Sequence, residues 1–276
     1  YFILYMNYLR SGLKLTSKLI KKHWKLFLIL LLLQAICLVS GVFIGTFYQV
    51  KIMENARGII EPLQNANYDS ESIKQGEPFT QEISSIYENY QSMTKNIFAL
   101  LGWLLLLFVV LNGRVWLLTQ QLFKKVKLKE EIQMLARFIV SLIVIMGVFF
   151  SISYGLLICL LRLEVSLNVF SIAIIGLLLV YALFYYLLIT ACALIHYSWK
   201  EFIQKFFVCA IKKIHKSALV LLINSCLLFL SLLIIFASIN YEKSLWFLLL
   251  AGLLLVVVMV ITRIFWVACL QELAKD

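Results

Sequence analysis

Residues 17–43 read SKLIKKHWKLFLILLLLQAICLVSGVF, a lysine-rich stretch followed by a long and nearly uninterrupted apolar run. A helix needs about 20 apolar residues to cross the apolar core of a bilayer, which is roughly 30 Å thick. The quoted stretch therefore predicts a membrane-spanning helix with a basic end. Its basic phrase, LIKKHWK at 19–25, returns as AIKKIHK at 210–216, again ahead of a long apolar run.

The composition extends this prediction to the whole chain of 276 residues, which is 63% hydrophobic and 14% charged. Soluble domains carry about 25% charged residues. The apolar residues form continuous blocks without period-two alternation, and this favours helices over a β-barrel. We predict an all-α polytopic membrane protein with six spans, at about Lys25–Gln49, Asn96–Leu118, Phe138–Leu161, Val169–Tyr197, Ser217–Ile239 and Leu245–Val267.

The net charge of +11 is concentrated on one side of the predicted membrane. Lysines and arginines crowd the segments 10–25, 124–137 and 200–216, whereas the long segment 50–95 holds more acidic than basic residues. By the positive-inside rule, both termini are cytoplasmic and 50–95 lies outside. We predict a multi-pass plasma (inner) membrane protein of a prokaryote. Its basic excess is expected to meet anionic lipid headgroups and not nucleic acid.

Each basic segment precedes an outgoing span and a returning span follows, which predicts three repeated hairpins. Residues 199–216 (WKEFIQKFFVCAIKKIHK) have amphipathic helical spacing. We expect cytoplasmic interfacial helices at 1–24 and about 199–216, with a six-span bundle over 25–276. The alternative is that these charges only stop transfer at the ends of straight helices. Headgroup contact is predicted for Lys21, Lys22, Trp24, Lys212, Lys213 and Lys216.

The outer segment at about 50–95 predicts a helical hairpin that projects from the membrane. Helical spacing continues out of the first span to Asn65 and runs from Ile83 into the second, with a turn-rich tip at Asn65–Pro78. The hairpin is either a docking surface for a partner or a solvated loop, and the sequence leaves both open.

Chemistry-bearing residues are sparse inside the predicted spans. No Asp or Glu lies in any span core, and both prolines lie in the outer segment, which predicts continuous helices and argues against an ion-coupled transporter. No nucleotide-binding or hydrolase motif occurs. The three histidines (His23, His196 and His215) lack ligand spacing, and the six cysteines include no CxxC. We expect no enzyme activity, no cofactor and no metal site.

Two arginines lie near the cytoplasmic ends of returning spans, Arg114 in RVW (114–116) and Arg263 in RIFW (263–266). Together with Asn112 they are candidates for binding an anion or a lipid phosphate. The alternative is that both arginines snorkel to the headgroups.

Small residues recur every four positions on two spans, a spacing that lets helix backbones approach closely. The interface that they predict lies within the bundle or with a partner, and its residues are Gly41, Gly45, Gly147, Ser151 and Gly155.

Residues 17–43 and 212–230 (KKIHKSALVLLINSCLLFL) resemble the repeated units of prokaryotic six-span proteins. YciC-like proteins and the membrane domains attached to some glycerophosphodiester phosphodiesterases are of this kind. The resemblance covers most of the chain in pattern and implies three hairpins with cytoplasmic interfacial helices. It transfers no catalytic residue.

The sequence thus predicts a non-enzymatic structural or accessory subunit of a membrane complex. Its expected partners are membrane lipids and either another protein or a second copy of the chain. The alternative is a channel or carrier for a lipid or small anion that uses Arg114 and Arg263.

Overall fold

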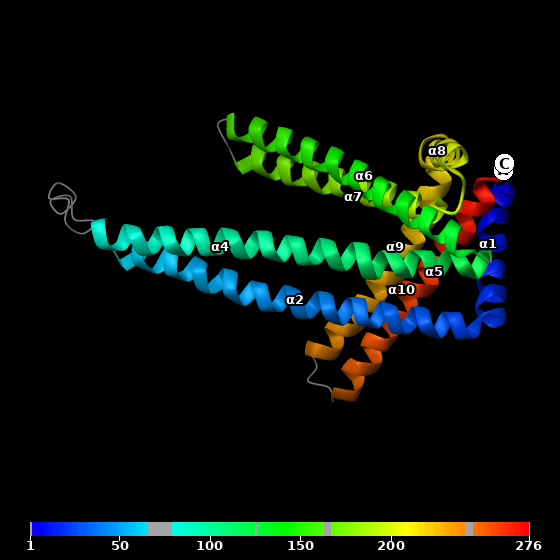
Figure 1. Ribbon diagram of the computed structural model, residues 1–276, viewed down its shortest axis with the longest axis horizontal. Coiled ribbons are helices and arrows are strands. Elements are labelled where there is room, and N and C mark those ends of the chain that lie inside the picture. Colours follow the sequence, from blue (N-terminus) through cyan, green and yellow to red (C-terminus); the bar gives the residue numbers. More distant parts are fainter. Residues whose placement is uncertain (1, 66–78, 125, 163–166, 241–244, 276) are drawn as a thin grey trace. The chain divides into compact units, whose positions relative to one another are not determined.

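The computed structural model describes residues 2–65, 79–124, 126–162, 167–240 and 245–275 (Figure 1). The α-helices are α1 (Phe2–Lys22), α2 (Trp24–Asn65), α4 (Phe79–Leu107), α5 (Gly113–Phe123), α6 (Leu128–Arg162), α7 (Leu167–Leu194), α8 (Trp199–Phe207), α9 (Ile214–Asn240) and α10 (Leu245–Leu273). Two π-helical turns accompany them, η1 (Phe108–Asn112) and η2 (Val208–Lys212). These described ranges contain no strand, which confirms the all-α prediction.

Six segments of the described chain are long and apolar enough to cross a membrane, and this confirms the six-span prediction. They are Trp24–Pro62, Ile83–Phe123, Leu128–Leu156, Ile174–Leu194, Ile214–Ile239 and Leu245–Leu273. The expectation of continuous α-helices is wrong for the second segment, because η1 interrupts it between α4 and α5. A π-helical turn inserts an extra residue and needs no proline, so the absence of proline did not reveal it.

The expected single helix at 199–216 is also divided. α8 ends at Phe207, η2 follows, and Lys213 leaves helical geometry (φ −112°, ψ 27°) before α9 begins. The hydroxyl of Ser217 bonds to the carbonyl oxygens of Cys209 and Lys213 at 3.0 and 3.2 Å. These bonds supply donors where the regular backbone ladder is broken.

The described chain forms two compact units. One contains the residues up to Gln34 and those from Gly113 onward, and the other is Ala35–Asn112. The chain passes from the first unit to the second within α2.

The smaller unit is an antiparallel pair made by the later part of α2 and by α4 (Figure 1). α2 continues through Pro62 to Asn65, although proline has no N–H to donate to the carbonyl oxygen of Gly58 four residues earlier. The Nδ2 atom of Asn89 on α4 donates to that oxygen at 3.4 Å. This pair includes the segments predicted to form a helical hairpin, whose location outside the membrane stays a prediction, and residues 66–78 of the predicted tip lie outside the described residues.

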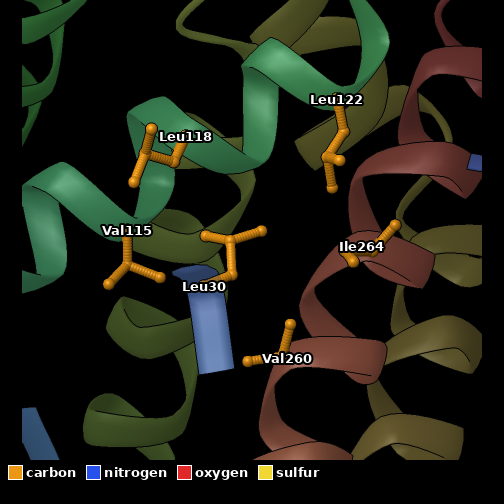
Figure 2. Packing of buried hydrophobic residues seen from close by; sticks show 6 residues of the cluster. All are labelled: Leu30, Val115, Leu118, Leu122, Val260 and Ile264. Carbon is orange, nitrogen blue, oxygen red and sulfur yellow. The ribbon is translucent and has the colours of Figure 1, made fainter. Parts of the chain in front are cut away.

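The larger unit has an apolar core where α2, α5 and α10 meet. Figure 2 shows the side chains of three helices converging, and all six are buried: Leu30, Val115, Leu118, Leu122, Val260 and Ile264. α10 contributes most to the interior, because ten of its last fourteen residues, from Val260 to Leu273, are buried. The opposite end of α10, from Leu245 to Leu250, is exposed.

Two hairpins of the larger unit share this pattern. α6 packs along α7 and α9 packs along α10, and the two pairs diverge away from the core (Figure 1). α7 is buried from Thr190 to Leu194, whereas Ile174, Ile175 and Tyr181 nearer its start are exposed. Packing inside this unit is therefore concentrated at one end of its spans.

α1 is amphipathic, as predicted, and its apolar side packs against α10. Gly12, Thr16 and Leu19 are buried, and the lysines of the helix are exposed. Gly12 permits a close approach, because a Cβ atom added there would stand 2.5 Å from the Sγ atom of Cys269. The apolar side of α1 thus covers the protein core, and its location at a membrane surface stays a prediction.

We expect Gly12→Ala to destabilise the protein by about 1–3 kcal/mol, as overpacking of a tight core does. The cost should vanish when Cys269→Ala removes the clashing sulfur atom, so Gly12→Ala is compared in both backgrounds by thermal unfolding in detergent. Gly147→Ala is the matched control, because no atom lies within 4 Å of a Cβ added there. An equal loss from Gly12→Ala in both backgrounds would contradict this packing.

Candidate functional site

The predicted anion ligand Arg114 is bound to a carboxylate of its own chain. Its guanidinium forms an ion pair with Glu131 on α6, and its side chain is 51% exposed. Arg263 on α10 has a different setting, with its guanidinium 5.1 Å from the centre of the buried Trp116 ring on α5. Such a cation–π contact stabilises an arginine near a low-dielectric core. Asn112 ends η1 in the other compact unit, and the role of all three residues in anion binding stays a prediction.

Two lysines of the third basic segment bind the C-terminal end of α10. The Nζ atom of Lys213 donates to the carbonyl oxygen of Leu273 at 2.8 Å, and that of Lys205 donates to Ala274 at 3.2 Å. The last carbonyls of a helix lack backbone donors and carry partial negative charge, so lysines stabilise them. Of the other residues predicted to contact headgroups, Lys21, Lys22, Trp24 and Lys212 are exposed and Lys216 is half-buried.

The four glycines of the predicted small-residue interfaces have no close neighbour. Apart from the backbone of its own helix, a Cβ atom added at Gly147 or Gly155 would meet no atom of the larger unit within 4 Å, and one added at Gly41 or Gly45 would meet none of the smaller unit. The hydroxyl of Ser151 donates to the carbonyl oxygen of Gly147 within α6. Neither unit by itself packs another element against these glycines, and the interface that they predict, within the bundle or with a partner, stays a prediction.

A buried polar network that the sequence analysis missed joins α7 to η2 and α9. The hydroxyl of Tyr186 lies 2.7 Å from the Oγ atom of Ser217 and 3.2 Å from the carbonyl oxygens of Cys209 and Ala210. All four residues are buried. Hydrogen bonds in a low-dielectric interior are strong, and losing one leaves a costly unsatisfied group.

The same end of α7 accepts bonds from two further helices. The Nε2 atom of Gln120 donates to the carbonyl oxygens of Ala193 at 2.8 Å and Cys192 at 3.3 Å. The indole of Trp266 donates to Ile189 at 3.1 Å. Nothing in the local sequence pattern signals these bonds, because each donor reaches a carbonyl more than seventy residues away.

Beside this network lies a group of cationic and imidazole side chains that we call the basic cluster: Lys124, Arg137, His196 and Lys205. Arg137 on α6 is 4% exposed, and its guanidinium lies 6.0 Å from the centre of the Trp199 ring on α8. Glu201 holds Ser198 at the start of α8, since its Oε2 atom accepts from the Ser198 N–H at 3.3 Å and from the hydroxyl at 3.0 Å. The cluster thus forms where two of the predicted basic segments meet.

His196 is uncharged at neutral pH. Burial and then the positive charge of Lys205 lower the pKa of His196 to about 4, with smaller contributions from Lys124 and Arg137, against an opposing backbone hydrogen bond at Ala193. Burial likewise raises the pKa of the Cys209 thiol to about 11, so this cysteine is not a reactive thiolate. Among the residues that the structure describes, no group of three or more His, Cys, Asp or Glu side chains is arranged to hold a metal ion.

The chain matches no protein-family model, and no curated protein or solved structure is significantly similar to it. The resemblance to YciC-like proteins and to the phosphodiesterase membrane domains therefore stays a prediction.

We expect Tyr186→Phe to lower the stability by about 1–3 kcal/mol, because it removes a buried hydroxyl and leaves its partners unsatisfied. The measurement is the midpoint of thermal unfolding in detergent. Tyr181→Phe is the control, since Tyr181 lies on the same helix with its side chain exposed. Equal midpoints for the two variants would show that the buried bonds of Tyr186 contribute nothing.

The low pKa of His196 predicts that acid destabilises the fold. An unfolded histidine titrates near its ordinary pKa of 6.5, so the unfolded state binds more protons between about pH 6.5 and 4. The protein should therefore become less stable as the pH falls from about 6.5 to 4. The variant His196→Asn should lose less stability over the same range. Unfolding midpoints at pH 7 and 5 test this, with the exposed His215→Asn as control. An unchanged acid sensitivity in His196→Asn would refute the prediction.

Proposed function

We propose that this integral membrane protein is a non-enzymatic structural or accessory subunit of a membrane complex. The observation that carries the proposal is how little of each span the chain covers by itself. In the four spans that lie wholly in the larger unit, the buried share of the most apolar window ranges from 17% to 28%. The packed end of the larger unit holds the fold together, and the remaining apolar helix surface is left for lipid or for a partner's helices.

The α6 helix offers a surface suited to another helix. Gly147 and Gly155 lie two turns apart with Ser151 between them, and no described atom lies near a Cβ added at either glycine. Small residues at this spacing allow a neighbouring helix to approach closely, so van der Waals contacts form that lipid chains do not match. This supports a partner that contributes a membrane-spanning helix, either another protein or a second copy.

A carrier that uses Arg114 and Arg263 as anion ligands has less support. An incoming anion would compete with the Glu131 carboxylate for Arg114, and Arg263 already lies against the Trp116 ring. Ion pairs of this kind serve to orient helices as well as to bind ligands.

The test is the association state of the chain purified in a mild detergent. Gly147→Leu with Gly155→Leu should remove the stoichiometric partner, or the second copy, while the unfolding midpoint of the chain itself changes little. Gly176→Leu on α7 is the control. A Cβ atom added at Gly176 also has no neighbour within 4 Å, but no small residue lies four positions away on that helix. A purified wild-type chain that is monomeric and transports an anion into liposomes would exclude the accessory role.

A further inference from the structure

Arg137 is a buried cation that pairs with no carboxylate among the described residues. Its side chain has no ion pair or hydrogen bond to any described residue, and its Nε atom is buried without an acceptor. Its guanidinium lies over the Trp199 ring, 6.0 Å from the ring centre. A buried charge is costly unless it is paired, and a ring face offers no lone pairs to the guanidinium N–H groups. The Nε donor of this charged side chain is therefore left without an acceptor among the described residues.

Among the residues that the structure describes, the side chains around Arg137 add positive charge. Arg137 faces the Trp199 ring. Lys205 lies 4.1 Å from the centre of the Tyr197 ring, and the centre of that ring lies 3.9 Å from the centre of the His196 ring. Besides the effect of burial, Lys124 and the other two cations also lower the pKa of His196, in keeping with this grouping. The Nδ1 atom of His196 is also buried without a hydrogen-bond partner in the described chain. Lys205 lies over the Tyr197 ring and donates a hydrogen bond to the carbonyl oxygen of Ala274. Neither contact neutralises the positive charge of Lys205.

The nearby carboxylates are already engaged. Glu130 lies 3.6 Å from Lys124, and its side chain is 46% exposed, so this pair is solvent-screened. Glu201 is fully exposed and accepts both bonds from Ser198, and these bonds lower the pKa of its carboxyl. Neither carboxylate contacts Arg137.

We propose that the basic cluster binds a phosphate group, with Arg137 as its central ligand and Lys124 at its open edge. A guanidinium presents paired N–H donors that match the oxygens of a phosphate, and lysines add charge without a fixed direction. The side chain of Lys124 is 65% exposed, whereas Arg137 is 4% exposed, so Lys124 forms the solvent side of the proposed site. Such a phosphate comes from a phospholipid headgroup or from a free phosphate, and both offer the same oxygens.

The site is separate from the arginines singled out by the sequence. In the sequence, Arg137 is only one of several basic residues in the segment 124–137. Its burial and its lack of a partner among the described carboxylates become visible only when α6 packs beside α8. The proposal does not depend on the accessory role, since a lone chain and an assembled one would both carry the site.

The experiment uses the full chain in detergent and measures the rise of the unfolding midpoint with ligand concentration. The probes are dioctanoyl phosphatidylglycerol, dioctanoyl glycerol as the same lipid without a phosphate group, and inorganic phosphate against chloride at equal ionic strength. The wild type should be stabilised by the phosphate-bearing lipid and not by dioctanoyl glycerol. Arg137→Gln should weaken the apparent affinity about tenfold or more.

Arg114→Gln is the matched control, because it removes the same charge from an arginine that is already paired with Glu131. Retained lipid stabilisation in Arg114→Gln with loss in Arg137→Gln assigns the site to a lipid phosphate. The same dependence on Arg137 with inorganic phosphate assigns it to free phosphate. Equal losses in both variants, or no loss in Arg137→Gln, would overturn the proposal.

A second pair of variants keeps the test decisive if Arg137→Gln does not fold. Lys124→Gln should weaken the same stabilisation, whereas Lys129→Gln, an exposed lysine in the same segment, should leave it unchanged. Indistinguishable ligand responses in these two variants would show that the stabilisation reflects general surface charge and no site.

Discussion

The burial of the C-terminal half of α10 is the constraint on which the larger unit depends. Its side chains meet α5 and the start of α2 in the apolar core, and its contacts extend to α1, α7 and α9. Helices in lipid gain little from hydrophobic burial, because lipid tails are as apolar as leucine. Close packing must then hold the helices together, and Gly12 beside Cys269 shows how closely α1 approaches α10.

Hydrogen bonds from side-chain donors add to the close packing of the helices. Tyr186, Gln120 and Trp266 each bond to backbone carbonyls of another helix or of η2, and Lys205 and Lys213 do so at the end of α10. In a low-dielectric interior, each of these bonds avoids the cost of a buried unsatisfied group and sets the register of one helix on the next. The π-helical turn η2 is stable in this setting, because Tyr186 and Ser217 supply donors to its carbonyls.

The two ends of the larger unit differ in how deeply their side chains are buried, and this difference bears on the proposed role of the protein. At the packed end, helices are buried on several sides and several polar side chains bond to backbone carbonyls of neighbouring elements, and the basic cluster lies at this end. At the other end, the hairpins α6–α7 and α9–α10 diverge and expose apolar side chains. Exposed apolar helices need lipid or partner helices around them, whereas Arg137, which pairs with no described carboxylate, is the group that we propose to bind a phosphate. One end is thus suited to a charged ligand and the other to association within the bilayer.

The sequence by itself determined the helical class, the six spans and the amphipathic character of α1, because length, hydropathy and helical spacing are local properties of the chain. It also singled out Arg114 and Arg263, since charges stand out in apolar runs, but it could not show that Arg114 faces Glu131 or that Arg263 faces Trp116. Only the tertiary structure decided that Gly12 and not Gly41 lies against a neighbour, and that Arg137 is buried beside Trp199. The physical reason is that burial and pairing depend on contacts between residues far apart in the chain, and no spacing within one helix encodes which neighbour it meets.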